Sequence, residues 1–251
     1  RRAPPTTGGM TSRRRFPLAL TTIVLACFAA PAVSQAGPGW LEPQQLAATS
    51  DSESNPLLVA NAAGDFAATW RTGVHVYGSV RRAGAPAWST VELTDNAANV
   101  NDVRIGVDHS GTFIVAWKNF DGAHNDALVS TLDPGSPTWD PSVIVSGTDD
   151  VDVVQMTTDS SGNAYVAFSG NPGSGPHIAV TKRASGQDAW SDTPTVVSGG
   201  DVSATNNSIL GLAVAADDAG RVTVLYPRPN GGQTEYRAVT SRTDGSWEDP
   251  Q

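Results

Sequence analysis

Cysteine is almost absent from this sequence: Cys27 is the single cysteine in 251 residues. One thiol cannot form an intrachain disulfide, and it supplies neither a cysteine-rich zinc site nor a redox-active pair. Cys27 also lies inside an apolar N-terminal segment, so the remainder of the chain has no thiol at all. The fold must therefore be stabilised by burial of apolar side chains rather than by covalent cross-links.

Positive charge is also scarce. The chain has 16 Lys and Arg residues against 25 Asp and Glu, which gives a formal net charge of −9. Several of the arginines fall within residues 1–15, so the rest of the chain is more acidic still. Binding to nucleic acid or to an anionic membrane surface needs clustered Lys and Arg, and this composition argues against both partners.

Long apolar runs are missing beyond the N-terminus. Residues 12–16 are Ser-Arg-Arg-Arg-Phe, residues 16–33 are mostly apolar, and small residues precede Gly37. This order is typical of a bacterial secretion signal, and prolines interrupt the apolar run, which disfavours a membrane-spanning helix. We expect residues 1–36 to be upstream residues and a signal for the general or the twin-arginine route. The mature protein is then extracellular or in the cell envelope, with no membrane insertion after signal removal.

A repeat is what the sequence does contain. A glycine turn recurs at Gly64, Gly111, Gly162 and Gly220, and a tryptophan recurs at Trp40, Trp88, Trp139, Trp190 and Trp247. The period of about fifty residues is typical of β-propeller blades. No segment of the mature chain has a sustained helical apolar pattern, so we expect almost no helix.

Each repeat unit divides into four short strand-like runs separated by turn residues. In the first unit the predicted strands are 56–61, 66–71, 75–80 and 88–93; in the second they are 103–107, 112–117, 127–132 and 139–145. The predicted blades lie near 56–95, 102–146, 152–198 and 208–251. The sequence thus predicts one all-β domain over residues 37–251, a β-propeller of four-stranded antiparallel blades.

The two ends of the repeat region carry the same pattern. Residues 40–46 match the outer strand that ends each unit, and residues 247–251 begin another such strand. An N-terminal outer strand commonly closes a propeller by pairing with the last blade. We therefore expect four blades of a larger propeller with 40–46 as an outer strand; a complete four-bladed ring is the alternative.

The segments before the repeated tryptophans resemble the Asp-box repeat of bacterial neuraminidases, Ser-x-Asp-x-Gly-x-Thr-Trp. The clearest are Ser130-Thr-Leu-Asp133-Pro-Gly135-Ser-Pro-Thr-Trp139 and Thr240-Ser-Arg-Thr-Asp244-Gly245-Ser-Trp247. The other units lack the aspartate, and three units are one residue longer on each side of the glycine. The resemblance implies a sialidase-like propeller in which this turn is structural and lies away from the active site. We expect the tryptophans to pack at the seams between blades.

Variable loops locate the candidate binding face. The loops between second and third strands, and those between blades, are long and irregular, and repeat proteins place their binding surfaces on such loops. Candidate ligand-binding residues near this face are Arg71, Arg104, Lys118, His124 and Arg228. Asp149, Asp150 and Asp152 form the densest acidic group, a candidate calcium site because Ca²⁺ prefers several oxygen ligands. Solvated turn chemistry is the alternative for these aspartates.

No catalytic residue is assigned. The chain shows no Ser/His/Asp order, phosphate-binding loop or zinc spacing, and the neighbouring Glu235 and Tyr236 would point to opposite faces of a strand. The sequence favours a secreted binding or scaffold module for a glycan or an extracellular protein, with no cofactor apart from possible calcium. The alternative is a sialidase-like glycoside hydrolase whose catalytic residues lie partly in blades outside this chain.

Overall fold

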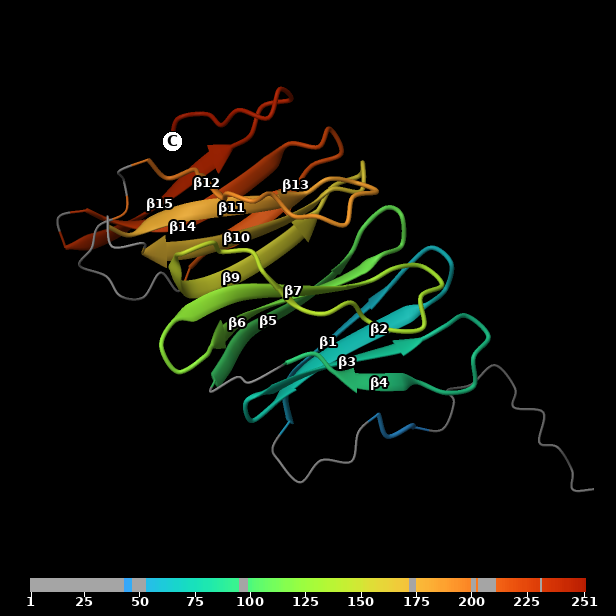
Figure 1. Cartoon of the computed structure of the whole chain (residues 1–251). Coiled ribbons are helices and arrows are strands. Elements are labelled where there is room, and N and C mark those ends of the chain that lie inside the picture. Colours follow the sequence, from blue (N-terminus) through green and yellow to red (C-terminus); the bar gives the residue numbers. More distant parts are fainter. Residues whose placement is uncertain are drawn as a thin grey trace, which may run out of the picture. The chain divides into compact units, whose positions relative to one another are not determined.

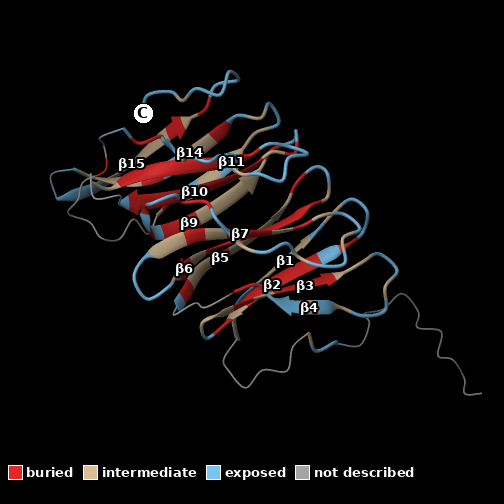
Figure 2. Cartoon of the chain, in the orientation of Figure 1, coloured by how far each residue is buried: buried red, intermediate tan, exposed pale blue. Residues whose placement is uncertain are grey.

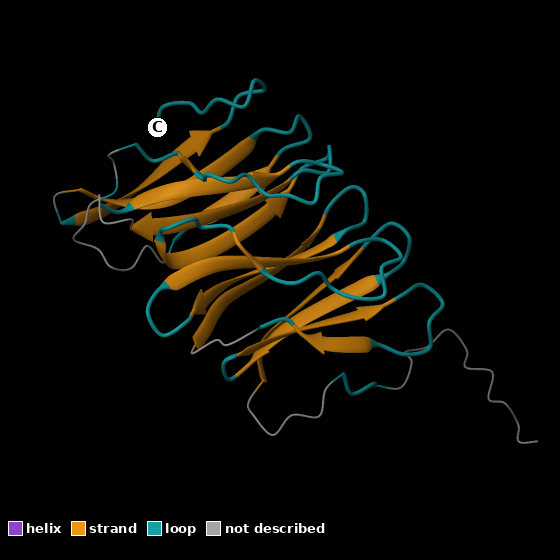
Figure 3. Ribbon diagram, in the orientation of Figure 1, coloured by secondary structure: helices purple, strands orange, loops and turns teal. Residues whose placement is uncertain are grey.

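The structure is a computed structural model that describes residues 43–46, 53–94, 99–171, 175–199, 202, 211–230 and 232–251. Trp40 and the predicted secretion signal within residues 1–36 lie outside the described residues. The chain divides at Pro43 into two units, and all that follows concerns the second, Gln44–Gln251. Its described residues form strands and no helix (Figure 3). Accordingly, the described part contains no helix of the length and apolar character that crossing a lipid bilayer requires.

The strands form four antiparallel sheets in which neighbours in sequence are neighbours in the sheet (Figure 1). Sheet 1 contains β1 (Glu53–Ala60), β2 (Phe66–Thr72), β3 (His75–Arg81) and β4 (Ser89–Glu92). Sheet 2 contains β5 (Asn99–Val107), β6 (Phe113–Phe120), β7 (Asn125–Leu132) and β8 (Val143–Ile144). Sheet 3 contains β9 (Asp150–Thr158), β10 (Ala164–Asn171), β11 (His177–Arg183) and β12 (Thr195–Val196). Sheet 4 contains β13 (Ala213–Ala216), β14 (Val222–Asn230) and β15 (Gln233–Thr240). The all-β prediction and the blade-like order of the strands are confirmed.

The turn between first and second strands is built the same way in all four sheets. In sheet 2 the amide of Gly111 donates to the carbonyl of Asp108, and the Asp108 carboxylate accepts from the amide of Thr112 at 3.0 Å. Gly111 has φ +91°, a conformation that glycine adopts without strain. Asn61, Asp159 and Asp217 hold their turns with the equivalent bonds. This conserved geometry is the physical basis of the repeated Asp-x-x-Gly pattern.

The core lies between successive sheets. The first strands contact one another in order, β1 with β5, β5 with β9 and β9 with β13. The aromatic residue of each later second strand, Trp117, Phe168 or Tyr226, is fully buried. Trp117, for example, packs in a cluster with Val76 of the preceding sheet. Strands β6 and β10 are buried along nearly their whole length (Figure 2).

Three of the repeated tryptophans also lie at seams between sheets. Trp139 packs against clusters that include Val76 and Val80 of sheet 1, and a Cβ on Gly78 would come within 3.0 Å of its ring. Trp190 packs against a cluster containing side chains of sheet 2, and Trp247 against one containing side chains of sheet 3. Each ring therefore covers apolar surface of the sheet before its own.

The outer strands are shorter than predicted. In sheet 2 the prediction was 139–145, but β8 contains only Val143–Ile144, and in sheet 3 β12 contains only Thr195–Val196. Pro141 and Pro194 explain this difference, because proline has no N–H to donate to the neighbouring strand. The tryptophans instead make single bridges or none, and irregular backbone joins them to the outer strands.

The predicted loops are shorter than expected as well. β1 and β5 begin within the predicted connecting loops, and each contains an irregularity next to a residue of positive φ, Asn55 in β1 and Asp102 in β5. Asn and Asp tolerate this conformation, so pairing resumes after the bulge. β14 and β15 likewise pair through Pro227 and Pro229, where a loop between the second and third strands was expected. Among the described residues β13 pairs only as far as Leu225, so the missing N–H groups of the two prolines interrupt no described pairing on that side.

Both ends of the repeat region lie beside outer edges of sheets. Within the described residues 43–46, the carbonyl of Leu46 accepts from Thr90 and the side chain of Gln44 donates to the carbonyl of Pro86. This segment thus lies beside the outer edge of sheet 1. At the other end, Gln251 pairs with Ala238 of sheet 4 through two backbone hydrogen bonds, in agreement with the prediction that residues 247–251 begin an outer strand. Closure of a larger propeller through residues 40–46 stays a prediction.

Candidate functional site

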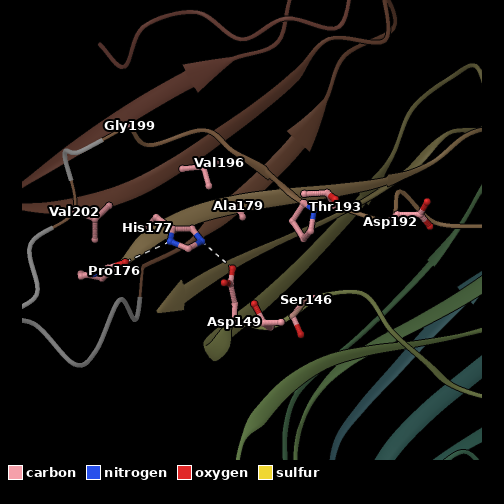
Figure 4. A pocket seen from close by; sticks show the side chains of 14 residues that line it. Ser146, Asp149, Pro176, His177, Ala179, Asp192, Thr193, Val196, Gly199 and Val202 are labelled. Carbon is pink, nitrogen blue, oxygen red and sulfur yellow. Dashed lines mark hydrogen bonds and ion pairs between the residues drawn. The ribbon is translucent and has the colours of Figure 1, made fainter. Parts of the chain in front are cut away.

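A pocket of about 620 Å³ opens at the end of the strands where the second strands stop and the third strands begin, which we call the loop end. It lies where the connection from sheet 2 meets the outer half of sheet 3 (Figure 4). The connection supplies residues 146–149, the start of β11 supplies residues 175–177, and the approach to β12 supplies residues 192–194. Ala179 and Val196 form its apolar floor. The pocket thus lies on the face that the loop pattern indicated, although no single loop forms it.

The connection from sheet 2 is fixed by the side chain of Ser146, which accepts a hydrogen bond from a strand amide in place of a backbone carbonyl. The Oγ of Ser146 accepts from the amide of Ala127 at 3.1 Å, and Gly147 then turns the chain with φ +67°. Thr94 and Ser198 cap the third strands of sheets 1 and 3 in the same way. Because this cap is rigid, it presents Asp149 to the pocket in a defined position.

Asp149 and His177 form the buried polar pair of the pocket. The Nε2 of His177 lies 2.8 Å from Oδ2 of Asp149, and the side chains are only 10% and 11% exposed. Gly170 allows this arrangement, because a Cβ at that position would lie 2.6 Å from Oδ2 of Asp149. The other ring nitrogen, Nδ1, faces the carbonyl of Gly175 at 3.4 Å. Both ring nitrogens thus lie near protein oxygens, and these contacts orient the ring as a wall of the pocket.

His75 of sheet 1, which corresponds to His177, lies in a more exposed environment. The Nδ1 of His75 lies 2.5 Å from Oε1 of Glu92, but these side chains are 43% and 40% exposed. Its carboxylate comes from the outer strand of the same sheet, whereas Asp149 comes from the connection between sheets. Only the sheet 3 histidine is therefore part of an enclosed site.

The surroundings of the pocket are acidic. Asp149 and Asp192 line it, and none of the described lining residues is a Lys or Arg. Nearby on the same end of the strands, burial raises the pKa of Asp126, and the carboxylate of Asp121 raises it further. Burial also raises the pKa of Asp152, against the lowering effect of Lys118. This end of the molecule thus disfavours an anionic ligand.

The predicted basic residues lie elsewhere, and three of them tie neighbouring sheets together. Arg71 donates from Nη1 to the carbonyl of Val100 and to Oδ1 of Asn101, both at 2.6 Å. Arg104 donates from Nε to Oε1 of Gln155 at 2.8 Å. Each guanidinium therefore bonds to the sheet that follows its own.

Lys118 follows the same rule, because its Nζ donates to the carbonyl of Asp152 at 2.8 Å. His124 is exposed in the turn between β6 and β7, where its amide donates to the carboxylate of Asp121. Arg228 lies in β14 opposite Glu235. None of the five basic candidates lines the pocket.

Two of the three aspartates proposed as calcium ligands form hydrogen bonds with different partners. Asp149 pairs with His177, while Oδ1 of Asp150 accepts from the amide and the side chain of Asn125, both at 2.9 Å. Over the residues that the structure describes, no three His, Cys, Asp or Glu side chains gather in a way that suits a metal ion. Calcium binding stays a prediction.

The Asp149–His177 pair was not found by sequence reasoning. Asp149 was predicted only as part of an acidic group, and His177 was not among the candidate residues. The available signal is that Asp149 lies between two repeat units and His177 follows a loop between second and third strands, and both kinds of loop belong to the predicted binding face. That signal does not specify a contact, because the approach of the two residues depends on how one sheet packs on the next.

Comparison with known proteins gives only distant similarity. No protein-family model matches the chain, and no curated protein sequence matches it. An endo-arabinase from Bacteroides thetaiotaomicron is similar in structure, with 12% identity, coverage of 78% of each chain and a TM-score of 0.48. An α-L-arabinofuranosidase from Podospora anserina is 13% identical over 79% of this chain and 67% of that one, with a TM-score of 0.42. A prolyl endopeptidase is 16% identical over 78% of this chain and 29% of that one, with a TM-score of 0.43. At TM-scores below 0.5 these similarities assign neither a family nor an activity to this chain.

Proposed function

We propose that this chain is a secreted bacterial binding module on a sialidase-like β-propeller scaffold, and that its loop-end pocket binds a neutral, hydroxyl-rich ligand such as a glycan. The observation that carries the proposal is the lining of the pocket. Carboxylates, hydroxyl groups and a histidine held on both sides line it, without a Lys or Arg.

A sugar matches this lining because its hydroxyl groups donate hydrogen bonds. The carboxylate of Asp149 keeps one oxygen, Oδ1, that His177 does not use, and a charged acceptor binds a hydroxyl donor strongly. Thr148 and Thr193 add neutral groups that both donate and accept. The volume of about 620 Å³ falls in the range of small-molecule sites, about 300–1,000 Å³, and suits one or two sugar rings.

The sialidase-like hydrolase is the weaker candidate. A sialoside carries a carboxylate, which requires arginines that are free to pair with it. Arg71 and Arg104 direct their guanidinium groups at oxygens of the following sheets, and the pocket is acidic. These contacts favour binding of a neutral ligand over cleavage of an anionic one.

The test is a binding screen of the purified protein against neutral oligosaccharides, with affinities measured by calorimetry. Asp149→Asn is expected to weaken binding about tenfold, the effect of removing one charge-assisted hydrogen bond. The matched control is Asp218→Asn, an exposed aspartate away from the pocket. Thermal melting of both variants verifies that they fold.

Two results would contradict the proposal. The first is that no neutral oligosaccharide binds, or that Asp149→Asn binds as tightly as the parent. The second is turnover of a fluorogenic sialoside that disappears in Arg104→Ala, which would favour the hydrolase instead.

A further inference from the structure

A second cavity lies between sheets 3 and 4, at the end of the strands that carries the Asp-x-x-Gly turns. Its volume is about 340 Å³. One position of the repeat differs at this cavity: the last residue of the third strand or the one after it. That position holds Leu132 in sheet 2, Arg183 in sheet 3 and Ser241 in sheet 4, each paired with the start of the second strand.

Each of these three residues faces the seam with the preceding sheet. Leu132 joins an apolar cluster with Ala67 of sheet 1. Arg183 reaches Asp108 of sheet 2 and donates from Nη2 to Oδ2 at 2.7 Å. Ser241 is too short to do either, and it lines the cavity together with Asp159, the sheet 3 equivalent of Asp108. The seam between sheets 2 and 3 also has a cavity, of about 280 Å³, which Arg183 lines, so the cavity beside the shorter Ser241 is the larger of these two.

The carboxylate of Asp159 is stabilised by hydrogen bonds and does not require a cation in the cavity. Burial alone would raise its pKa, but hydrogen bonds from the side chain and amide of Asn163, from the Tyr165 hydroxyl and from the Ser161 amide together lower it. Its Oδ2 accepts from Asn163 at 2.7 Å and from Tyr165 at 2.9 Å. The carboxylate is therefore satisfied within its own sheet, and a bound guanidinium or ammonium group has no vacant acceptor there.

The remaining charges on the cavity walls are positive. Lys182 of sheet 3 lies with Nζ 5.4 Å from the centre of the Tyr165 ring, and Arg242 follows β15. Arg242 uses Nη1 to bond Ser246 and the carbonyl of Trp247, which fixes the guanidinium beside the cavity. With one carboxylate and two cations, this cavity has a net positive lining, in contrast to the acidic loop-end pocket.

Aromatic rings complete the cavity. Trp247 and Tyr165 both line it, and an aromatic face offers the C–H face of a sugar a flat apolar surface. Ser191, Thr195 and Thr243 supply hydroxyl groups. An aromatic surface, hydroxyl groups and two cations together match a sugar ring that carries an anionic substituent.

We propose that the cavity between sheets 3 and 4 is a second binding site, for an acidic saccharide. The sugar ring packs against Trp247 and its anionic group lies between Lys182 and Arg242. The site is distinct from the neutral-ligand pocket, because the two share no lining residue, although neighbouring residues of sheet 3 line each of them.

The experiment compares a galacturonate trimer with a neutral galactose trimer by calorimetric titration of the full protein. The acidic trimer is expected to bind at least about tenfold more tightly at low ionic strength, and to weaken as salt screens the exposed cations. A sulfated galactose trimer distinguishes the two anionic groups: carboxylate selectivity gives weaker binding, whereas charge alone gives equal binding. Equal binding of the neutral and acidic trimers, or no binding of either acidic trimer, would overturn the proposal.

Variants locate the ligand. Lys182→Gln and Arg242→Gln are each expected to weaken acidic-trimer binding about three- to tenfold, as for a partly exposed charge pair. Ser241→Leu copies the neutral residue that sheet 2 has at this position and should fill part of the cavity and weaken this binding. Arg221→Gln, an exposed arginine of the same sheet outside the cavity, is the control that should bind normally.

Failure of this proposal is separable from failure of the proposed function. Asp149→Asn should leave acidic-trimer binding unchanged, and Lys182→Gln should leave neutral-ligand binding unchanged. If Lys182→Gln melts at the parent temperature and still binds the acidic trimer as tightly, the cavity is not the site.

Discussion

Replacing Arg183 with leucine should destabilise the protein strongly, because it breaks a buried ion pair between sheets 2 and 3. The guanidinium of Arg183 is 2.7 Å from Asp108, with the two side chains 4% and 0% exposed. In Arg183→Leu the carboxylate of Asp108 keeps its bonds from Ser110 and the Thr112 amide but loses its only cation partner among the described residues. An uncompensated charge is then left in a dry seam.

The expected loss is about 3–5 kcal/mol, the range for removing one partner of a buried pair. For a domain of this size that corresponds to a fall in melting temperature of about 6–20 °C, at about 2–4 °C per kcal/mol. The ion pair itself is worth much less, since the Nε of Arg183 is buried without a hydrogen-bond partner in the described residues. The expected loss of stability in Arg183→Leu therefore comes from the buried carboxylate of Asp108, which is left without a cation partner.

The chain contains a natural control for this reasoning, because the seam between sheets 1 and 2 has an uncharged version of the pair. There Asn61 occupies the place of Asp108, its Nδ2 donates to the carbonyl of Gly111 on the next sheet, and Leu132 occupies the place of Arg183. The double variant Asp108→Asn/Arg183→Leu copies this arrangement and should recover most of the lost stability. Chemical and thermal unfolding of the parent, single and double variants provide the measurement. A single variant that melts within about 2 °C of the parent, or a double variant no more stable than the single, would refute the argument.

Three further predictions follow from the same structure. Trp139→Ala should cost about 2–4 kcal/mol in unfolding free energy, because it uncovers apolar surface at the first seam; an unchanged melting temperature would contradict that packing role. Gly170→Ala should abolish ligand binding in the loop-end pocket and lower the melting temperature, because its Cβ would displace Asp149 from its buried pair with His177; calorimetry well below the melting temperature measures the loss of binding separately. The amide of Ala83 holds the pKa of Asp65 below its usual value, so its stabilisation is present above about pH 4 and is lost as the pH falls through the lower folded pKa; Asp65→Asn should flatten that part of the stability–pH curve.

The strands were predictable because their signals are local. In sheet 1 the strands His75–Arg81 and Phe66–Thr72 each lie within one residue of the prediction. The turns between first and second strands follow directly from an Asp or Asn that bonds its own backbone and a glycine of positive φ. The outer strands failed for an equally local reason that was overlooked, since Pro141 interrupts the ladder and the prediction counted only the apolar residues around it.

The site was less predictable because it depends on contacts between units. The basic residues Arg71, Arg104 and Lys118 were assigned to the binding face from their position, yet each bonds to the following sheet. Sequence pattern gives the end of the strands on which a side chain lies, but not whether it points to solvent or to a neighbouring sheet. The pairing of Asp149 with His177 was missed for the same reason.

One repeat position differs between the seams, while the backbone pattern around it stays the same. The seam residue is leucine, arginine or serine in successive sheets, and the turn of the preceding sheet holds Asn61, Asp108 or Asp159. Leucine adds apolar contacts and arginine adds an ion pair, but the seam beside Arg183 still has a cavity of about 280 Å³. The seam beside Ser241 has a cavity of about 340 Å³, and there Asp159 is satisfied by groups of its own sheet rather than by a cation. A binding site of this kind costs the fold little, because the turn, the strand register and the tryptophan contact are retained on either side of it.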